Sequence, residues 1–418
     1  MIMLKKYLSI TLLLLSFSIV FSQEKEVNPP FNIKTITFVQ SGQNTIPVFK
    51  LGDSFQLQFD DLLGTEANFY YTIKHCDYDW KQSQLSSNEY LGGFDDQRII
   101  DYTNSFNTLQ LYSHYRVSFP NKFTQIKVSG NYVISILNED RELVFSRKFI
   151  LYEDIVSVPM QVKRARDVRS VDHKHNIDFS IKTSLFTFQS PLQNVKVLLM
   201  QNGKFNDAIT NIKPMFTVGN DLVYKYDKET QFWAGNEYLF FENKNIQAAN
   251  NSVGYVTSDG GLYGTHLLTN NARGNNPYTF WPDINGNFLV NILNRENPEI
   301  ESDYAWVYFS LSAPAFYEKK DIYICGMFNN YATNDESKME YNEKKGIYEK
   351  AMMIKQGFTN YNYVIADSKG TIDNENAIDG NFYQTENNYF ALVYYRENNQ
   401  RYDRVIGKGV ATSTDIIN

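Results

Sequence analysis

The chain has 418 residues, and its 40 Lys and Arg against 47 Asp and Glu give a formal net charge of −7. Aromatic residues make up 15% of the sequence, whereas Gly and Pro number only 22 and 11, which excludes a disordered, collagen-like or flexible linker protein. With two Cys and five His, the chain is neither a disulfide scaffold nor a multi-zinc protein. At roughly 150 residues per domain, its length predicts two or three domains.

The first 22 residues have the pattern of a secretory signal peptide. Lys5 and Lys6 form a positive region, an uncharged and mostly apolar segment follows over 7–21, and Ser22 supplies a small residue at a cleavage site. The apolar segment is shorter than the roughly 20 residues that a membrane span requires, so cleavage is favoured over an uncleaved anchor. The sequence thus predicts an acidic exported protein, which is a poor ligand for nucleic acid or an anionic membrane surface.

After this segment, apolar and polar residues alternate with a period of two. Phe55, Leu57 and Phe59 share one face of a strand at 54–59, and a second clear alternation covers 303–311. Further strands are expected at 68–76, 111–119, 131–137, 143–151, 176–183, 221–226, 236–241, 321–327, 347–354, 358–366 and 389–395. No long helical period is present, so the sequence predicts an all-β protein.

Two joints are expected between groups of strands. The first follows the strand at 143–151, where a Pro and a basic run come next, and the second lies around Pro314. They predict β-sandwich modules over 28–155, 160–312 and 316–418. About seven short strands at a spacing of roughly 8–12 residues are typical of an immunoglobulin-like sandwich, which we expect for the first module.

The basic run after the first joint contains Lys163, Arg164, Arg166 and Arg169. Such a run can dock an acidic partner, but it is more often a solvated linker, and we favour the linker.

The segment at 70–80 is the densest group of reactive residue types. Asp77 and Asp79 could act as paired carboxylates, and His75 and Cys76 as a base and a nucleophile. Adjacent residues of a strand point to opposite faces, however, so this His and Cys cannot easily hydrogen-bond each other. We favour a buried Cys that ends a strand, Asp side chains that close a turn, and packing of Trp80.

Two further sets of residues are candidates for a metal site or a disulfide. His173 and His175 could share a strand face as metal ligands, but no third ligand is near in sequence, and a surface turn is favoured. Cys76 and Cys325 fall in different predicted modules, so two free, buried thiols are favoured over a disulfide. Common hydrolase, metalloprotease, nucleotide-binding and calcium-binding motifs are missing from the sequence, and we expect no enzyme.

Several segments, read together, resemble one family, the plug proteins of the type IX secretion system. The resemblance covers roughly 30–410. The segments are 71–80, 89–94, 113–115, 129–132, 201–203, 235–237, 283–286, 326–329, 355–357, 361–363 and 393–396. The signature residues within them are His75, Cys76, Asp77, Trp80, Tyr90, Gly93, His114, Tyr115, Gly130, Asn131, Tyr132, Gly326, Phe328, Asn329, Lys355, Gln356 and Gly357.

The resemblance implies a periplasmic protein without enzymatic activity or cofactor. Its partner would be the large outer-membrane β-barrel translocon, whose periplasmic mouth the plug closes when no substrate or shuttle protein occupies it. No catalytic or ligand residue belongs to the family pattern, so the signature residues are interpreted as fold-determining, and direct insertion into lipid is not expected.

The third predicted module has a weaker, second resemblance, to the early-set sandwiches that include starch-binding modules. Those carry a sugar-stacking Trp where this chain has Tyr331, and Tyr361 and Tyr363 could also stack on sugars. Carbohydrate binding is therefore the alternative function. An outer-membrane barrel and a secreted cargo are less favoured, because the C-terminal residues lack both a terminal aromatic strand and a recognisable sorting module.

Overall fold

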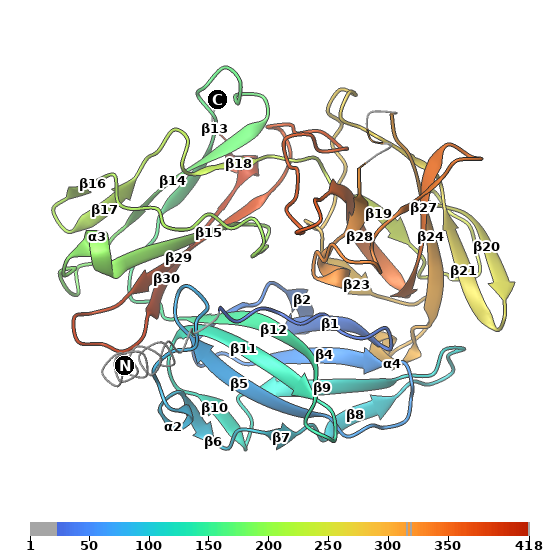
Figure 1. Ribbon diagram of the computed structural model, residues 1–418, viewed down its shortest axis with the longest axis horizontal. Coiled ribbons are helices and arrows are strands. Elements are labelled where there is room, and N and C mark those ends of the chain that lie inside the picture. Colours follow the sequence, from blue (N-terminus) through green and yellow to red (C-terminus); the bar gives the residue numbers. More distant parts are fainter. Residues whose placement is uncertain (1–22, 315–316, 318–319, 417–418) are drawn as a thin grey trace, which may run out of the picture.

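The computed structural model describes residues 23–314, 317 and 320–416, so the predicted signal peptide lies outside the described residues. The described chain folds into three lobes of packed β-sheets that lie around a common centre (Figure 1). Each lobe has its own apolar core. The predicted all-β fold is confirmed.

The first lobe consists of strands β1 to β12 and a single helical turn. One sheet has the order β2-β1-β4-β9-β8, a second has the order β3-β12-β11-β5-β7, and β10 pairs with β6. The bounds are β1 Ile33–Gln40, β2 Gln43–Thr45, β3 Val48–Lys50, β4 Phe55–Asp61, β5 Tyr70–Cys76, α2 Ser87–Tyr90, β6 Leu91–Gly93, β7 Gln97–Arg98, β8 Asp101–Asn104, β9 Ser113–Phe119, β10 Thr124–Ile126, β11 Gly130–Leu137 and β12 Leu143–Tyr152. Phe55, Leu57 and Phe59 are all buried in the core, as their alternation predicts.

The second lobe combines strands from the middle and the end of the chain. Its sheets have the orders β13-β14-β17-β16, with β18 also on β14, and β15-β29-β30. The bounds are β13 Met160–Arg164, β14 Lys174–Ile181, α3 Pro191–Asn194, β15 Val195–Gln201, β16 Phe216–Val218, β17 Asp221–Tyr224, β18 Gln231–Trp233, β29 Asn388–Tyr395, β30 Arg404–Thr412 and η3 Ser413–Asp415.

The third lobe contains the strands that lie between these two parts of the chain. Its sheets have the orders β19-β28-β23, with β25 also on β28, and β20-β21-β24-β27-β26, with β22 also on β24. The bounds are β19 Leu239–Glu242, β20 Val253–Asp259, β21 Leu262–Leu267, β22 Asn270–Asn271, β23 Phe288–Val290, α4 Pro298–Glu301, β24 Tyr304–Ser312, β25 Ile322–Cys325, η2 Met327–Asn329, β26 Glu340–Asn342, β27 Ile347–Lys355 and β28 Gly357–Ile365.

The sheets cross the boundary expected between the modules 160–312 and 316–418. Strand β15 pairs along its whole length with β29, from Val195 opposite Tyr395 to Gln201 opposite Tyr389. In Figure 1 the red strands β29 and β30 lie in the green second lobe, far along the chain from their neighbours. The residues around Pro314 therefore separate neither two sheets nor two cores, and this boundary is corrected. Local spacing cannot detect such pairing, because the hydrogen-bonded partners are almost 200 residues apart.

Most expected strands are present to within a few residues, but several strands were missed. Strand β15 has no alternation because Val197 and Leu199 belong to the core of the second lobe, while Leu198 and Met200 pack against the first lobe. A strand that is buried on both faces forms a continuous apolar run. Strand β30 was missed because two Gly interrupt its pattern; a Cβ at Gly407 would lie 2.5 Å from Cγ2 of Val156.

We predict that Gly130→Ala destabilises the first lobe. Gly130 has a φ of +154°, and a Cβ there would lie 2.1 Å from Nε2 of His75, whose ring is fully buried. Strain and overpacking together should lower the free energy of unfolding by about 2–4 kcal/mol, measured by urea denaturation. Gly42→Ala is the matched control, because Gly42 also has a positive φ (+76°) but has no atom within 4 Å of its Cβ position. Equal losses in the two variants would contradict the steric explanation.

Candidate functional site

The segment after β5 forms the junction between the first and second lobes. Cys76 ends the strand, and the backbone N–H of Trp80 donates to the carbonyl oxygen of Asp77 at 2.9 Å, which closes the expected turn. Trp80 is buried, and its ring contacts Phe205 of the second lobe edge-on at 5.5 Å. The predicted strand end and Trp packing are confirmed, but a backbone hydrogen bond closes the turn; the Asp77 side chain pairs with Arg396, and of the two carboxylates only that of Asp79 accepts from a turn N–H, that of Lys81 at 3.4 Å.

His75 and Cys76 point away from each other, as expected for neighbours in a strand. Nδ1 of His75 lies 2.7 Å from Oγ of Ser83, and its ring packs edge-on against Tyr132. Cys76 belongs to the apolar cluster between the first two lobes. Burial lowers the pKa of His75 to about 4 and raises the pKa of the Cys76 thiol to about 12. The two side chains therefore do not form a nucleophile and its base.

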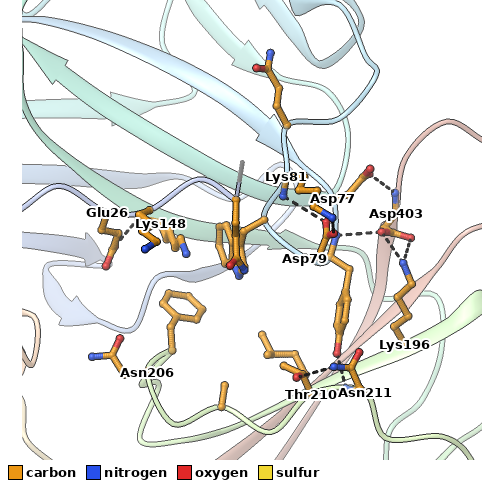
Figure 2. A pocket seen from close by; sticks show the side chains of 18 of the residues that line it. Glu26, Asp77, Asp79, Lys81, Lys148, Lys196, Asn206, Thr210, Asn211 and Asp403 are labelled. Carbon is orange, nitrogen blue, oxygen red and sulfur yellow. Dashed lines mark hydrogen bonds and ion pairs between the residues drawn. The ribbon is translucent and has the colours of Figure 1, made fainter. Parts of the chain in front are cut away.

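Charged residues of both lobes meet beside this turn (Figure 2). Nη2 of Arg396 lies 2.7 Å from Oδ1 of Asp77 and 3.0 Å from Oδ2 of Asp403, and Nζ of Lys196 lies 3.1 Å from the same Oδ2. Asp403 is buried, and its Oδ2 also accepts a hydrogen bond from the N–H of Tyr78 at 3.0 Å. The Arg396–Asp77 ion pair and the hydrogen bond from Tyr78 to Asp403 join the first lobe to the β29–β30 hairpin of the second, and Lys196 of β15 holds Asp403 in place.

Asn131 makes a further polar link across the same junction. Its Nδ2 donates to the carbonyl oxygen of Asp77 at 3.0 Å, and its Oδ1 accepts from the hydroxyl of Tyr394 at 2.7 Å. The signature residues around 75–80 and 130–132 thus hold the first lobe against the second.

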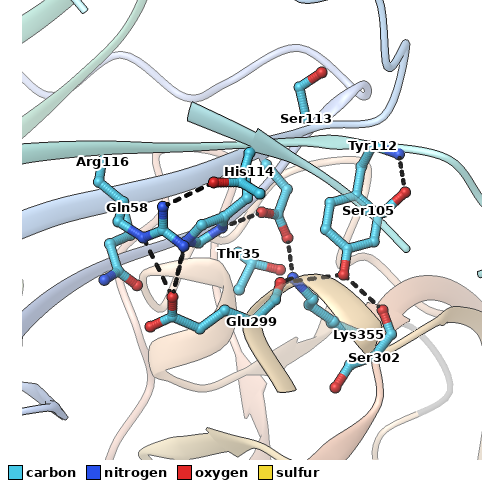
Figure 3. Close-up of polar contacts among 12 residues, drawn as sticks. Thr35, Gln58, Ser105, Tyr112, Ser113, His114, Arg116, Glu299, Ser302 and Lys355 are labelled. Carbon is cyan, nitrogen blue, oxygen red and sulfur yellow. Dashed lines mark hydrogen bonds and ion pairs between the residues drawn. The ribbon is translucent and has the colours of Figure 1, made fainter. Parts of the chain in front are cut away.

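A second polar cluster joins the first lobe to the third (Figure 3). The carboxylate of Asp60 is fully buried; its Oδ1 lies 2.6 Å from Nδ1 of His114, and its Oδ2 accepts from Nζ of Lys355 and from the hydroxyl of Tyr304, each at 2.6 Å. Burial alone would raise the pKa of Asp60, but Lys355 and His114 lower it below its ordinary value. Nζ of Lys355 also lies 4.1 Å from the ring centre of Tyr112.

The residues after Lys355 support this junction. Oε1 of Gln356 accepts from the N–H of Asp303 at 2.8 Å, and the carboxylate of Asp303 accepts from the backbone N–H groups of Leu109 and Gln110 in the first lobe. Gly357 has no room for a side chain, because a Cβ would lie 2.0 Å from the carbonyl oxygen of Leu289.

The remaining signature residues make contacts within their own lobes. A Cβ at Gly93 would lie 1.9 Å from the carbonyl oxygen of Phe123, and one at Gly326 would lie 2.6 Å from that of Asn360. Four side chains donate hydrogen bonds to backbone carbonyl oxygens. The pairs are Tyr90 with Ile73 (3.1 Å), Tyr115 with Ala67 (2.8 Å), Tyr132 with Val128 (2.7 Å) and Asn329 with Ile324 (2.8 Å). Phe328 is half-buried against the core of the third lobe.

The two other histidines considered as ligands do not form a site. His173 lies in an exposed turn, as favoured, but His175 is buried in β14, with Nδ1 2.7 Å from the hydroxyl of Tyr389. The surface-turn interpretation is therefore wrong for His175. Among the described residues, no group of three or more His, Cys, Asp or Glu is placed to hold a metal ion.

The basic run is not a linker. Lys163 and Arg164 lie in β13, and Nζ of Lys163 is 2.6 Å from Oδ2 of Asp178, while Nη2 of Arg164 is 2.7 Å from Oδ1 of Asp172. Arg166 is exposed, 3.3 Å from Asp227. Arg169 lies in the exposed turn that follows. The linker prediction is corrected, because cross-strand carboxylates allow a strand to carry these charges.

The two cysteines are free and buried, as expected.

Two of the tyrosines considered for sugar stacking are not available for that role, because Tyr361 and Tyr363 are buried in the third lobe. Their hydroxyls both donate to Oδ1 of Asn270, each at 2.8 Å. Tyr331 is half-buried beside Lys204, whose Nζ lies 5.9 Å from its ring centre.

A pocket of about 990 Å³ lies where the three lobes meet (Figure 2). Its walls come from the turn at 77–84 and from β12 in the first lobe, and from β15 and the loop at 205–213 in the second. Residues 330–333 of the third lobe, the N-terminal segment at 23–28, and Arg396 and Asp403 of the second lobe also line it. A concavity of this size at a domain junction is the ordinary location of a binding site.

Sequence analysis missed several residues that build these junctions, above all Asp60, Tyr304, Arg396 and Asp403. A signal was present for one of them, because Asp60 is a charged residue at the end of an apolar strand, a position where burial requires a partner. Its partners could not be named from sequence, since Tyr304 and Lys355 follow it by almost 250 and 300 residues.

Comparison with known proteins identifies the family. The model of the first domain of the type 9 secretion system plug protein matches residues 33–153, which correspond to the first lobe. The chain belongs to the type IX secretion system plug protein family. This membership supports a role in type IX secretion and a location in the cell envelope.

A solved structure extends the likeness to all three lobes. The crystal structure of a hypothetical protein from Parabacteroides merdae superimposes with a TM-score of 0.88 at 32% identity, covering 94% of this chain and 100% of that one. No curated protein matches the sequence. No helix among the described residues is long and apolar enough to cross a membrane.

Removing Lys355 should destabilise the junction of the first and third lobes. Lys355→Met leaves Asp60 buried without its cation, and we expect a loss of about 3–5 kcal/mol in the free energy of unfolding, measured in urea. Adding Asp60→Asn should recover a large part of this loss, because the buried site is then neutral. Lys34→Met is the control, since its pair with the half-exposed Glu336 joins the same lobes at 2.9 Å and should contribute no more than about 1 kcal/mol. Failure of the double variant to recover stability would contradict the electrostatic explanation.

Stability should fall as pH decreases from neutral, through His75 and His175. Burial lowers the pKa of each to about 4, so below pH 6.5 the unfolded chain binds protons that the folded chain does not. The contribution of each neutral histidine to the free energy of unfolding is complete above pH 6.5 and is lost between pH 6.5 and 4. At pH 5 the loss is about 2 kcal/mol per histidine. Urea unfolding of the protein at pH 7 and pH 5 tests this. His175→Gln should reduce the difference between the two pH values, and an unchanged difference would contradict the assignment.

Proposed function

We propose that this protein is a non-enzymatic periplasmic plug that binds and closes the periplasmic end of the type IX secretion outer-membrane translocon. The observation that carries the proposal is the family match over the first lobe. The P. merdae structure shares the arrangement of the three lobes along nearly the whole chain, so the matched first domain belongs to a fold found in a second protein.

A body that closes a wide aqueous pore must be rigid and broad. In this protein, breadth comes from three lobes placed around a centre rather than in a line (Figure 1). Rigidity comes from the two buried ion-pair clusters and from the apolar cluster that includes Cys76, Trp80 and Leu198. Pulling the first lobe away from the third would leave Asp60 without Lys355, and pulling it away from the second would separate Asp77 from Arg396; either movement would expose apolar surface.

The residues of the segment 70–80 that the sequence offers as possible reactive groups have structural roles, which agree with a non-enzymatic plug. Asp77 holds Arg396, His75 fills the space left by Gly130, and Cys76 packs in the apolar junction. No specific observation favours the carbohydrate alternative, since Tyr361 and Tyr363 face the core.

Capture of the tagged protein from its host envelope in mild detergent tests the proposal. We expect mass spectrometry to identify a very large outer-membrane β-barrel protein in stoichiometric amount. A tagged periplasmic protein of similar size and acidic charge is the control for non-specific capture.

Deletion provides a second, independent measurement. A strain without the plug should admit more of a large polar antibiotic or dye across its outer membrane, and a plasmid copy should restore the barrier. Capture without any barrel protein, together with unchanged permeability, would overturn the proposal.

A further inference from the structure

The central pocket has a charge opposite to that of the whole chain. Six basic side chains and four carboxylates line it, in a protein whose formal net charge is −7. We propose that this pocket binds an extended acidic peptide segment of the secretion partner, an inference that rests on the proposed plug function.

Three of the six lining cations are already paired within the protein. Lys81 lies 2.8 Å from Asp79, Lys196 pairs with Asp403, and Arg396 pairs with both Asp77 and Asp403. The remaining carboxylate, that of Glu26, accepts hydrogen bonds from the backbone N–H of Lys148 at 2.7 Å and from the side chain of Asn330 at 2.8 Å. The pocket's acidic groups are therefore occupied.

The other three cations, Lys25, Lys148 and Lys213, have no carboxylate within ion-pair distance in the described part of the chain. Lys148 is half-buried, with Nζ 4.3 Å from the ring centre of Trp80, and burial lowers its pKa. Glu26 and Glu24 oppose this lowering of the pKa from beyond ion-pair distance. A partly desolvated ammonium without a directly paired carboxylate gains more from a bound carboxylate than an exposed ammonium does.

The positions of these three lysines favour a peptide over a compact anion as the ligand of the pocket. Lys25 belongs to the N-terminal segment, Lys148 to β12 and Lys213 to the second lobe, so they approach the pocket from separate segments. A phosphate is typically bound by convergent, bidentate Arg groups, whereas separate ammonium groups suit carboxylates spaced along a chain.

Uncharged groups of the lining suit the rest of a peptide. Phe205 and Leu198 offer apolar contact, and Asn206, Thr210 and Asn211 line the second-lobe wall (Figure 2). The side-chain amide of Asn206 is exposed and has no hydrogen-bond partner among the described residues, so it is free to bond a peptide backbone.

The first test uses the purified protein and a fluorescein-labelled hexapeptide of alternating Asp and Phe, followed by fluorescence anisotropy. We expect saturable binding that is lost at 0.5 M NaCl, and none to the matching hexapeptide of Lys and Phe. Inorganic phosphate at 10 mM should not compete. Equal binding of the two peptides, or full competition by phosphate, would overturn the proposal.

Charge variants then place the site. Lys25→Glu/Lys213→Glu changes two exposed side chains and should weaken binding of the acidic peptide at least about tenfold. Lys148→Gln removes the half-buried charge without reversing it, so it should weaken binding of the acidic peptide by a smaller factor. Lys228→Glu/Lys369→Glu, which makes the same charge change at exposed positions outside the pocket, should leave binding unchanged. Equal weakening by the two double variants would overturn the assignment to the pocket.

Capture from the envelope separates this inference from the proposed function. If the wild-type protein captures the barrel and Lys25→Glu/Lys213→Glu captures as much of it, the pocket is not where the partner binds, although the protein remains a plug. If even the wild-type protein captures no barrel, the plug function fails, and with it the identity of the partner.

Discussion

The buried carboxylate of Asp60 is the constraint on which the arrangement of the lobes depends. It lies in β4 of the first lobe, where burial in apolar surroundings would strongly disfavour its charge. Lys355 of the third lobe and His114 of the first keep it ionised, and the hydroxyl of Tyr304 from the third lobe donates a further hydrogen bond to it. The ion pair adds little net stability by itself, but separating its partners is very unfavourable, so it specifies how the two lobes sit.

The second junction also combines ion pairs with apolar packing, and apolar contacts form a larger part of it. Arg396 pairs with Asp77 of the first lobe as well as with Asp403 of its own, and the apolar cluster of Cys76, Trp80 and Leu198 packs beside them. Because β29 and β30 return to the second lobe after the third is complete, the second and third lobes are linked twice by the chain. Two polar junctions and a returning hairpin therefore give one body with a pocket at its centre.

This construction explains why the family signature lies where it does. His75, Asp77, Asn131, His114 and Lys355 all lie at or beside the junctions between lobes. Residue types that usually indicate catalysis here neutralise buried charge or fill space. Lys25, Lys148 and Lys213 of the pocket differ from them, because no carboxylate of the described residues lies within ion-pair distance of these lysines, and this difference underlies the proposal that a partner binds there.

The sequence by itself determined the strands and the family. Alternating residues such as Phe55, Leu57 and Phe59 predict one buried face, because a strand has a period of two, and short segments such as 71–80 carry the resemblance. Sequence could not show that β15 pairs with β29, that His175 is buried, or that Asp60 meets Lys355. These contacts join residues about 200 to 300 positions apart, and no local pattern encodes which distant strand will complete a sheet or which distant cation will neutralise a carboxylate. Only the tertiary structure decided the lobes, their junctions and the pocket between them.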